Sequence, residues 1–242
     1  MSGGSRGIGA ATARLAGERG YDVAVAYEKD REAAERVAAE VANAGSRALA
    51  VRADVAQERD VVHLFDEAAH ALAPPCAVLA CAGVTGGFSR VEDLSVQTLE
   101  RVLSVNVIGT ILLAREAVRR MSTRRGGRGG SIVTVSSIAA QLGGAGEWVH
   151  YAASKGAVET FTVGLAREVA SEGIRVNCVS PGLIETGLHA AAGDSDRPRR
   201  LAAGIPLGRP GTAAEVAEGV LWLLSSAASY TTGAILRISG GR

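Results

Sequence analysis

The fold of this chain is decided near its amino terminus by the stretch Ser2-Gly3-Gly4-Ser5-Arg6-Gly7-Ile8-Gly9. Its glycines allow a tight turn and let backbone amides approach an anion at the start of a helix, where the dipole favours negative charge. A glycine cluster alone could equally be a flexible tail. Here a helix-forming run follows directly, and the strand pattern Asp22–Tyr27 lies beyond it. This order of turn, helix and strand predicts a turn that binds the pyrophosphate of a dinucleotide, with the spacing Gly-x-x-x-Gly-x-Gly.

Beyond this turn, short apolar β-branched runs alternate with longer amphipathic segments. The predicted strands are Val23–Tyr27, Ala48–Arg52, Ala77–Cys81, Ser131–Ser136, Arg175–Val179 and Ala234–Ile238. The predicted helices include Arg31–Ala44, Glu58–Leu72, Val96–Met121, Val149–Ser171 and Ala213–Ser225. Alternating apolar strands and helices predict an α/β fold, in which a doubly wound parallel sheet is covered on both faces. We expect residues 1–242 to form one domain.

Composition narrows the classes of partner. The formal net charge of the 242 residues is +1, which gives no electrostatic reason to expect nucleic acid or an anionic membrane. One basic cluster is interpreted as a solvated helix end and loop: Arg119, Arg120, Arg124, Arg125 and Arg128. No uninterrupted apolar run is long enough to cross a bilayer, and the chain does not begin with a signal peptide. We therefore expect a cytoplasmic protein.

The three cysteines, Cys76, Cys81 and Cys178, are odd in number and lie mostly in apolar runs. This usage suits reduced, buried thiols in a cytosolic protein. None of them has the spacing of a zinc site, and we expect no metal.

Tyr151 and Lys155 form the clearest candidate for catalysis, in the segment Tyr-Ala-Ala-Ser-Lys. Positions i and i+4 share one face of a helix, so the phenol and the ammonium can meet. Lys155 is one of only two lysines in an arginine-rich chain. A compact ammonium, unlike a planar guanidinium, suits a position beside a phenol whose pKa it lowers.

These features together resemble the short-chain dehydrogenase/reductase family in its single-domain form, over nearly the whole chain. Six segments carry the resemblance: Ser2–Gly9, Ala80-Cys81-Ala82-Gly83, Asn106, Ser137, Tyr151 with Lys155, and Pro181–Thr186. The family's two asparagines are absent from Ala80–Gly83. Ser136 stands next to Ser137, and the spacing to Tyr151 leaves open which serine is catalytic.

The resemblance implies roles for four catalytic residues. Tyr151 exchanges a proton with the substrate oxygen, and Lys155 lowers the tyrosine pKa and binds ribose hydroxyls. Ser137 hydrogen-bonds the substrate oxygen, and Asn106 anchors a water in a proton relay to Lys155. His150 precedes the tyrosine but points about 100° away from it on a helix, so we expect it to pack rather than to act as a base.

The resemblance also implies which residues bind the cofactor. They are Gly3, Ser5, Arg6, Gly7, Ile8, Gly9, Tyr27, Asp54, Val55, Ala82, Gly83, Tyr151, Lys155, Pro181, Gly182, Ile184 and Thr186.

We expect NADP(H) to be preferred and NAD(H) to remain possible. The end of the second strand carries Tyr27 where an NAD enzyme has an acidic residue, and Arg6 and Lys29 could hold a 2′-phosphate. Glu28 would reverse this choice if its carboxylate faced the ribose.

The implied function is hydride transfer between NADP(H) and a carbonyl or alcohol, closest to 3-oxoacyl thioester reductases, with glucose 1-dehydrogenase-like activity as an alternative. A nucleotide-sugar epimerase or dehydratase would need an added carboxy-terminal region. A non-catalytic cofactor-binding scaffold is the alternative from another class. The substrate pocket is expected from Gly143–His150 and from a loop at about 183–210, within the irregular stretch Pro181–Pro210.

Two further expectations concern assembly and the first strand. The chain is expected to form a homotetramer or homodimer through its two longest helices, Val96–Met121 and Val149–Ser171.

Met1 stands directly before the glycine turn, so the given chain has no residues to form the first strand of the sheet. We expect apolar residues upstream in the natural polypeptide, or another segment that fills the gap.

Overall fold

Strands and helices alternate along the chain in the computed structural model, which describes residues 1–242. The strands are β1 (Val23–Tyr27), β2 (Ala48–Arg52), β3 (Ala77–Ala80), β4 (Gly130–Val135), β5 (Ile174–Pro181), β6 (Ile184–Glu185), β7 (Gly211–Thr212) and β8 (Ile235–Ile238). All six predicted strands form, and their ends differ from the prediction by two residues at most. The two extra strands, β6 and β7, are short and pair only with each other.

The helices are α1 (Gly7–Glu18), α2 (Arg31–Asn43), α3 (Glu58–Ala71), α4 (Val96–Leu103), α5 (Gly109–Met121), α6 (Ala139–Leu142), α7 (Val149–Val169), α8 (Gly187–Ala191), α9 (Arg197–Arg200) and α10 (Ala213–Leu224). Side chains fix several of their starts. Asp30 accepts the backbone N–H of Ala33 at the start of α2, and Thr212 and Glu215 form a capping box at the start of α10.

All strand pairs are parallel, in a two-stranded sheet β1-β2, a four-stranded sheet of order β3-β4-β5-β8 and the short pair β6-β7. Met1 and Ser2 lie between β1 and β3, where the first strand was expected. The N–H of Ser2 donates to the carbonyl of Leu79 at 3.0 Å, and Ala26 donates to Met1 at 2.9 Å. These two residues therefore link the two larger sheets, at the middle of β1 and at the carboxyl end of β3.

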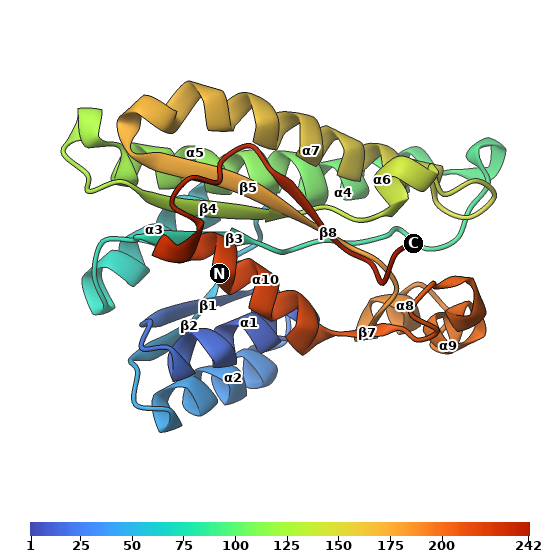
Figure 1. The fold of residues 1–242 in the computed structure, drawn as a ribbon, viewed down its shortest axis with the longest axis horizontal. Coiled ribbons are helices and arrows are strands. Elements are labelled where there is room, and N and C mark those ends of the chain that lie inside the picture. The colour runs from blue at the N-terminus through green and yellow to red at the C-terminus, as the bar shows by residue number, and fades with distance from the viewer.

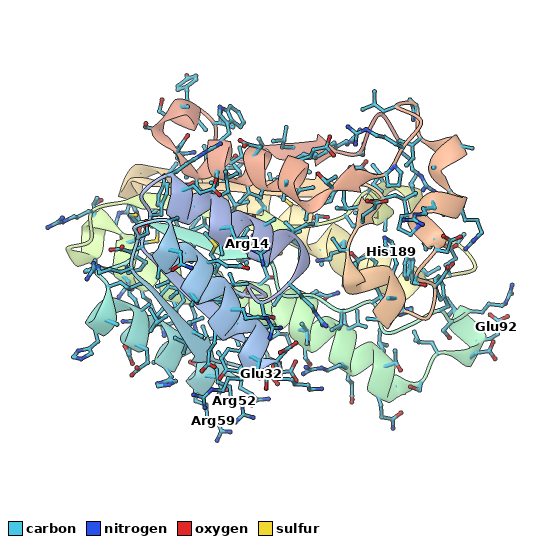
Figure 2. All side chains as sticks on the ribbon, turned by 90° about the horizontal axis from the view of Figure 1, so that it is seen from below. Arg14, Glu32, Arg52, Arg59, Glu92 and His189 are labelled. Atoms are coloured by element: carbon cyan, nitrogen blue, oxygen red, sulfur yellow. The ribbon has the colours of Figure 1, made fainter.

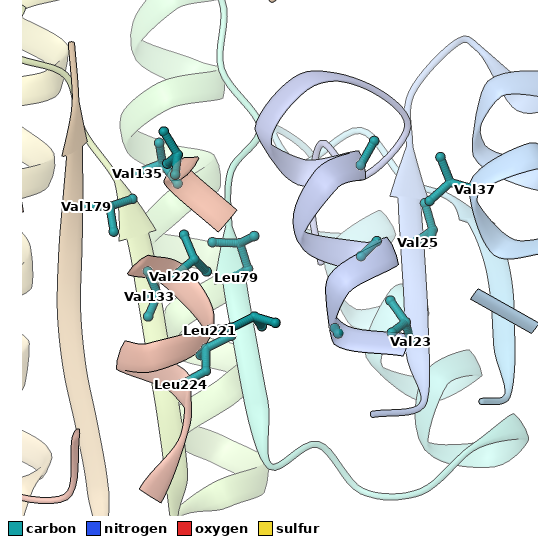
Figure 3. Packing of buried hydrophobic residues seen from close by; sticks show 14 of the residues in the cluster. Val23, Val25, Val37, Leu79, Val133, Val135, Val179, Val220, Leu221 and Leu224 are labelled. Atoms are coloured by element: carbon teal, nitrogen blue, oxygen red, sulfur yellow. The ribbon is translucent and has the colours of Figure 1, made fainter. Parts of the chain in front are cut away.

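Both faces of the sheet are covered by helices (Figure 1), α1, α2 and α10 on one face and α3, α5 and α7 on the other. Neighbouring strand residues therefore enter opposite cores, as Leu79 and Val78 do. Figure 3 shows the first core, where Leu79 packs beside Val220 and Leu221 of α10, and Val25 lies beside Val37 of α2. The doubly wound α/β class is confirmed.

The stretch Val96–Met121 is not one regular helix. A π-helical turn, Ser104–Ile108, separates α4 from α5 and carries the fully buried Asn106. By length and composition alone this stretch could cross a membrane, although charged residues such as Glu100 and Arg101 interrupt its apolar run. In the fold it packs against α7 and α3 and against strands β3 and β4, which accounts for its apolar residues.

The stretch Pro181–Pro210 is also more ordered than expected. It contains β6 and the short helices α8 and α9, which lie at one end of the molecule (Figure 1). Thr186 caps α8 by accepting the N–H of Leu188. These elements stand beyond the carboxyl end of β5, the edge of a parallel sheet where ligands bind.

Candidate active site

A cavity of about 620 Å³ runs along the carboxyl ends of the strands, at the point where the chain switches from one side of the sheet to the other. One end is lined by the loops after β1 and β2, the middle by the glycine turn and the loop after β3. The other end is lined by Ser137, Tyr151 and the helix α8. A volume of this size suits an organic cofactor together with a small substrate.

The glycine turn packs closely against neighbouring backbone because its glycines have no side chains. Gly3 has φ +61°, and a Cβ there would lie 2.9 Å from the backbone of Ala82. A Cβ on Gly9 would lie 2.2 Å from the carbonyl oxygen of Gly3. The start of α1 is thereby packed directly under the turn, and its first amides face the cavity, as pyrophosphate binding requires.

Tyr151 and Lys155 lie one turn apart on α7, as their spacing predicts, and both are buried at the cavity. The Nζ of Lys155 donates to the carbonyl of Val135 at 2.7 Å and lies 5.6 Å from the centre of the Tyr151 ring. Burial raises the pKa of Tyr151 to about 12, which a hydrogen bond to Ser137 only partly offsets. Burial also lowers the pKa of Lys155.

The dominant cause of the raised pKa of Tyr151 is loss of solvation of the phenolate. The phenol is therefore fully protonated at neutral pH. That Lys155 lowers this pKa stays a prediction.

The two adjacent serines both line the cavity but have different partners. The hydroxyl of Ser136 is engaged by Glu159 at 2.9 Å and by the carbonyl of Lys155 at 3.1 Å. Ser137 instead hydrogen-bonds Tyr151. This difference favours Ser137 as the candidate catalytic serine.

Asn106 lies behind the cavity wall. Its amide holds both backbone groups of Val84, with each of the two hydrogen bonds 2.9 Å long, and donates to the hydroxyl of Ser154 at 2.9 Å. A Cβ on Gly83 would lie 3.4 Å from both Asn106 Oδ1 and Lys155 Nζ, so these polar atoms approach the same point. Asn106 thus fixes the loop after β3 where it passes the lysine.

Charged residues surround the opposite end of the cavity, beside Tyr27. Glu28 accepts from Arg101 at 2.8 Å and lies 3.6 Å from Lys29. Arg101 also donates to Asp54 at 3.3 Å. Arg6 has no ion-pair partner. This end therefore combines cations with a carboxylate that is already paired.

Aromatic residues form the wall beside Tyr151. The Trp148 ring lies 5.7 Å from the Tyr151 ring and 6.2 Å from the His189 ring. Phe88 stacks on Trp148 at 4.9 Å, and the guanidinium of Arg197 lies 4.7 Å from the indole centre. His150 packs here as expected, bonded through Nε2 to the carbonyl of Thr85 at 2.8 Å.

Of the residues expected to be catalytic or to bind the cofactor, all but two line this cavity. The two exceptions are Gly9, beneath the glycine turn, and Asn106, behind the loop after β3. Of the segment Gly143–His150, which was expected to line the substrate pocket, only Trp148 does so. Sequence reasoning missed Arg101 and His189, which also line it. Arg101 reaches the site from α4 and carries no motif, whereas His189 lies in the segment expected to form the substrate pocket.

The chain resembles known proteins over its full length. Residues 3–242 match a family model described as enoyl-(acyl carrier protein) reductase. The sequence is 47% identical to an uncharacterized oxidoreductase, YgfF, of Escherichia coli strain K12, covering 100% of this chain and 98% of that protein. It is 38% identical to a 3-oxoacyl-[acyl-carrier-protein] reductase of Rattus norvegicus, covering 99% and 94%. A crystal structure of a short-chain type dehydrogenase/reductase from Mycobacterium marinum superposes with a TM-score of 0.93 at 35% identity, covering 100% and 93%.

The chain belongs to the short-chain dehydrogenase/reductase family. It is thus an NAD(P)-dependent oxidoreductase that acts on a small-molecule substrate. The cavity of this dehydrogenase/reductase fits such a dinucleotide, because Gly3, Gly7 and Ile8 of the glycine turn line its middle at the start of α1.

Proposed function

We propose that this enzyme transfers a hydride between NADP(H) and a carbonyl or alcohol substrate, most closely as a 3-oxoacyl thioester reductase does. One observation carries the proposal: Ser137, Tyr151 and Lys155 converge at the end of a cavity whose middle is the glycine turn. The glycine turn would hold the pyrophosphate of the dinucleotide. When bound, the dinucleotide supplies the hydride for reduction or accepts it in oxidation.

Tyr151 would supply the proton to the developing alkoxide. A phenol with its pKa raised to about 12 is fully protonated at neutral pH and is ready to donate. Ser137, bonded to the same phenol, would hold the substrate oxygen beside it and stabilise the charge that develops there. The supporting fact is that both hydroxyls open onto one part of the cavity.

Lys155 would hold ribose hydroxyls and return a proton towards Tyr151. Its buried Nζ is fixed by the carbonyl of Val135 and lies near Gly83 and Asn106. Asn106 would act by positioning the loop after β3, and by anchoring a water that links Lys155 to solvent.

The remaining cofactor contacts are assigned by their place in the cavity. Ser5, Gly7 and Ile8 would contact the pyrophosphate, Asp54 and Val55 the adenine, and Ala82 with Gly83 the neighbouring ribose. The segment after β5 would frame the nicotinamide through Pro181, Gly182, Ile184 and Thr186.

NADP(H) would be preferred because cations outnumber available carboxylates around Tyr27. Arg6 has no ion-pair partner, and Lys29 is largely exposed at 85% of its side chain. Glu28, which could otherwise accept a ribose hydroxyl and repel a 2′-phosphate, is paired with Arg101 at 2.8 Å. A charge-assisted contact to phosphate contributes about 1.5–3 kcal/mol.

The cofactor preference is tested by fluorescence titration of NADPH and NADH. Arg6→Ala should weaken NADPH about tenfold and leave NADH within about threefold, because only the 2′-phosphate needs the cation. Glu28→Gln should change the affinity for NADH little. Tighter binding of NADH by the wild type, or its loss in Glu28→Gln, would show that Glu28 holds the ribose instead.

A 3-oxoacyl thioester is the leading substrate class because the rat relative of this name aligns over nearly the whole chain. The segment 183–210 would form the substrate loop through α8 and α9. A sugar is the alternative substrate, and a scaffold that binds cofactor without turnover is the alternative function. NADPH oxidation should be followed with 3-oxoacyl thioesters, small ketones and sugars. Binding of NADPH without turnover of any of them would favour the scaffold.

Assembly as a homotetramer or homodimer would follow from the exposed apolar residues of the longest helices. Four apolar residues are more than a third exposed: Val96 on α4, Ile108 in the π-helical turn, Ile111 on α5 and Val149 on α7. Light scattering after gel filtration should give a multiple of 24.7 kDa. A monomer at micromolar concentration would contradict this proposal.

A further inference from the structure

His189 is a buried polar residue that the proposed chemistry does not use. It stands on α8 at one end of the molecule (Figure 2), lines the cavity and is only 7% exposed. Five buried side-chain nitrogen or oxygen atoms in the protein have no hydrogen-bond partner. Of these, only His189 Nδ1 belongs to a residue that lines the cavity. Nδ1 has almost no exposed surface, whereas Nε2, which also has no hydrogen bond to protein, is not closed off in this way. A ligand group in the cavity can therefore bond to the ring through Nε2.

The residues around His189 hold its ring in place but form no hydrogen bond with its nitrogens. Its ring lies against Trp148, and the segment that carries it is tied down by Arg197, which donates to both carboxylate oxygens of Glu147 at 2.8 and 2.5 Å. Arg197 is only 5% exposed, so this ion pair joins the α9 segment firmly to the loop before α7. No hydrogen bond to protein occupies either nitrogen of the imidazole.

The charge state of the His189 ring limits which chemical groups of a ligand it can bind. Burial, and secondly the charge of Arg197, lower the pKa of His189, while Asp194 and Glu147 act more weakly in the other direction. The ring is neutral at pH 7 and offers one N–H donor and one acceptor nitrogen. A neutral imidazole suits a hydroxyl or carbonyl oxygen better than a carboxylate.

The nearby cations are already engaged. Arg197 is bonded to Glu147, and the Nζ of Lys155 is bonded to the carbonyl of Val135. The other residues on this wall, such as Leu188 and Ala191, are apolar. A substrate carboxylate placed here would be desolvated without a partner, which is unfavourable.

We infer that His189 is a specificity-determining residue that hydrogen-bonds a second, uncharged oxygen of the substrate while Trp148 packs against its carbon skeleton. This inference rests on the proposed function and refines it: the substrate is a neutral keto compound with a second carbonyl or hydroxyl oxygen. A 3-oxoacyl thioester has such an oxygen, and a simple ketone does not.

The test compares two neutral ketones of equal chain length, ethyl 3-oxobutanoate and 2-heptanone, in NADPH-dependent reduction. The wild type should favour the ester in kcat/KM. His189→Phe keeps an aromatic ring beside Trp148 but cannot hydrogen-bond. The ratio of kcat/KM for the ester to kcat/KM for 2-heptanone should therefore fall about tenfold or more, mainly because the KM for the ester rises. His189→Gln keeps a donor and an acceptor and should restore most of the ratio.

His70→Phe is the matched control, because His70 is exposed on α3 far from the cavity lining, and its ratio should equal that of the wild type. A His189→Phe ratio within twofold of wild type, or an equal fall in His189→Gln, would overturn the inference alone. NADPH binding by the wild type with no reduction of either ketone or of any compound in the wider panel would overturn the proposed function with it.

Discussion

Replacing Asn106 by alanine should destabilise the protein and impair catalysis together. The side chain is fully buried and satisfies both the N–H and the carbonyl of Val84 at 2.9 Å. Its loss leaves two partly buried backbone groups unpaired, at about 1–3 kcal/mol each, or about 2–6 kcal/mol in total. For a chain of this size, in which 1 kcal/mol shifts Tm by about 2–4 °C, that corresponds to a fall in Tm of about 4–24 °C. The loop after β3 would no longer be held beside Lys155, so kcat should also fall, by about tenfold or more.

Thermal unfolding and steady-state kinetics at 25 °C on the same preparations measure both effects. Asn177→Ala is the matched control, because Asn177 is equally buried and holds the backbone of Thr231 and Ala234 at 2.8 and 3.0 Å, away from the cavity. It should lower Tm by a similar amount and leave kcat nearly unchanged. A fall in Tm below about 2 °C for Asn106→Ala, or an equal loss of kcat in both variants, would refute the reasoning.

Three other outcomes are expected. Gly9→Ala should weaken NADPH binding more than about tenfold, since its Cβ would lie 2.2 Å from the carbonyl oxygen of Gly3, whereas Gly164→Ala, with open space around it, should bind normally. Because the pKa of Tyr151 is about 12, reduction should be flat from about pH 6 to 9 while alcohol oxidation, which needs the phenolate, rises about tenfold per pH unit. A plateau of oxidation below about pH 8 would contradict this. Glu147→Gln should speed limited proteolysis near Arg197, whose buried charge loses its partner, and unchanged cleavage would count against that role.

Much of the fold could be predicted because local sequence determines it. Apolar β-branched runs such as Val23–Tyr27 can be stable only as strands buried on both faces, and the expected bounds of that strand match those observed. The glycines of the first turn were recognisable because no other residue fits so close to a backbone.

Other features depend on contacts that local sequence does not encode. The π-helical turn at Ser104–Ile108 has no signature in composition, since it differs from an α-helix only in its hydrogen bonds. Arg101 is 73 residues from Glu28 in the chain, so their pairing appears only in the fold. The raised pKa of Tyr151 likewise follows from burial, which is a property of the whole packed site.

The helices within 183–210 were missed for a related reason. Helices α8 and α9 have five and four residues, too short for a helical period to show. The burial of Arg197 in α9 is set by Glu147, 50 residues earlier. His189 could not be singled out before this segment was seen to pack against Trp148.

The most direct test of the central claim, that Tyr151 is the proton donor of a hydride-transfer enzyme, is Tyr151→Phe measured in two assays on one preparation. The substitution removes a hydroxyl and almost no contact area. NADPH affinity, from fluorescence titration, should therefore stay within about threefold of wild type. Turnover of the best carbonyl substrate should fall by about a thousandfold or more, because no other group in hydrogen-bond reach can deliver the proton. Turnover within tenfold of wild type, with NADPH still bound, would contradict the account.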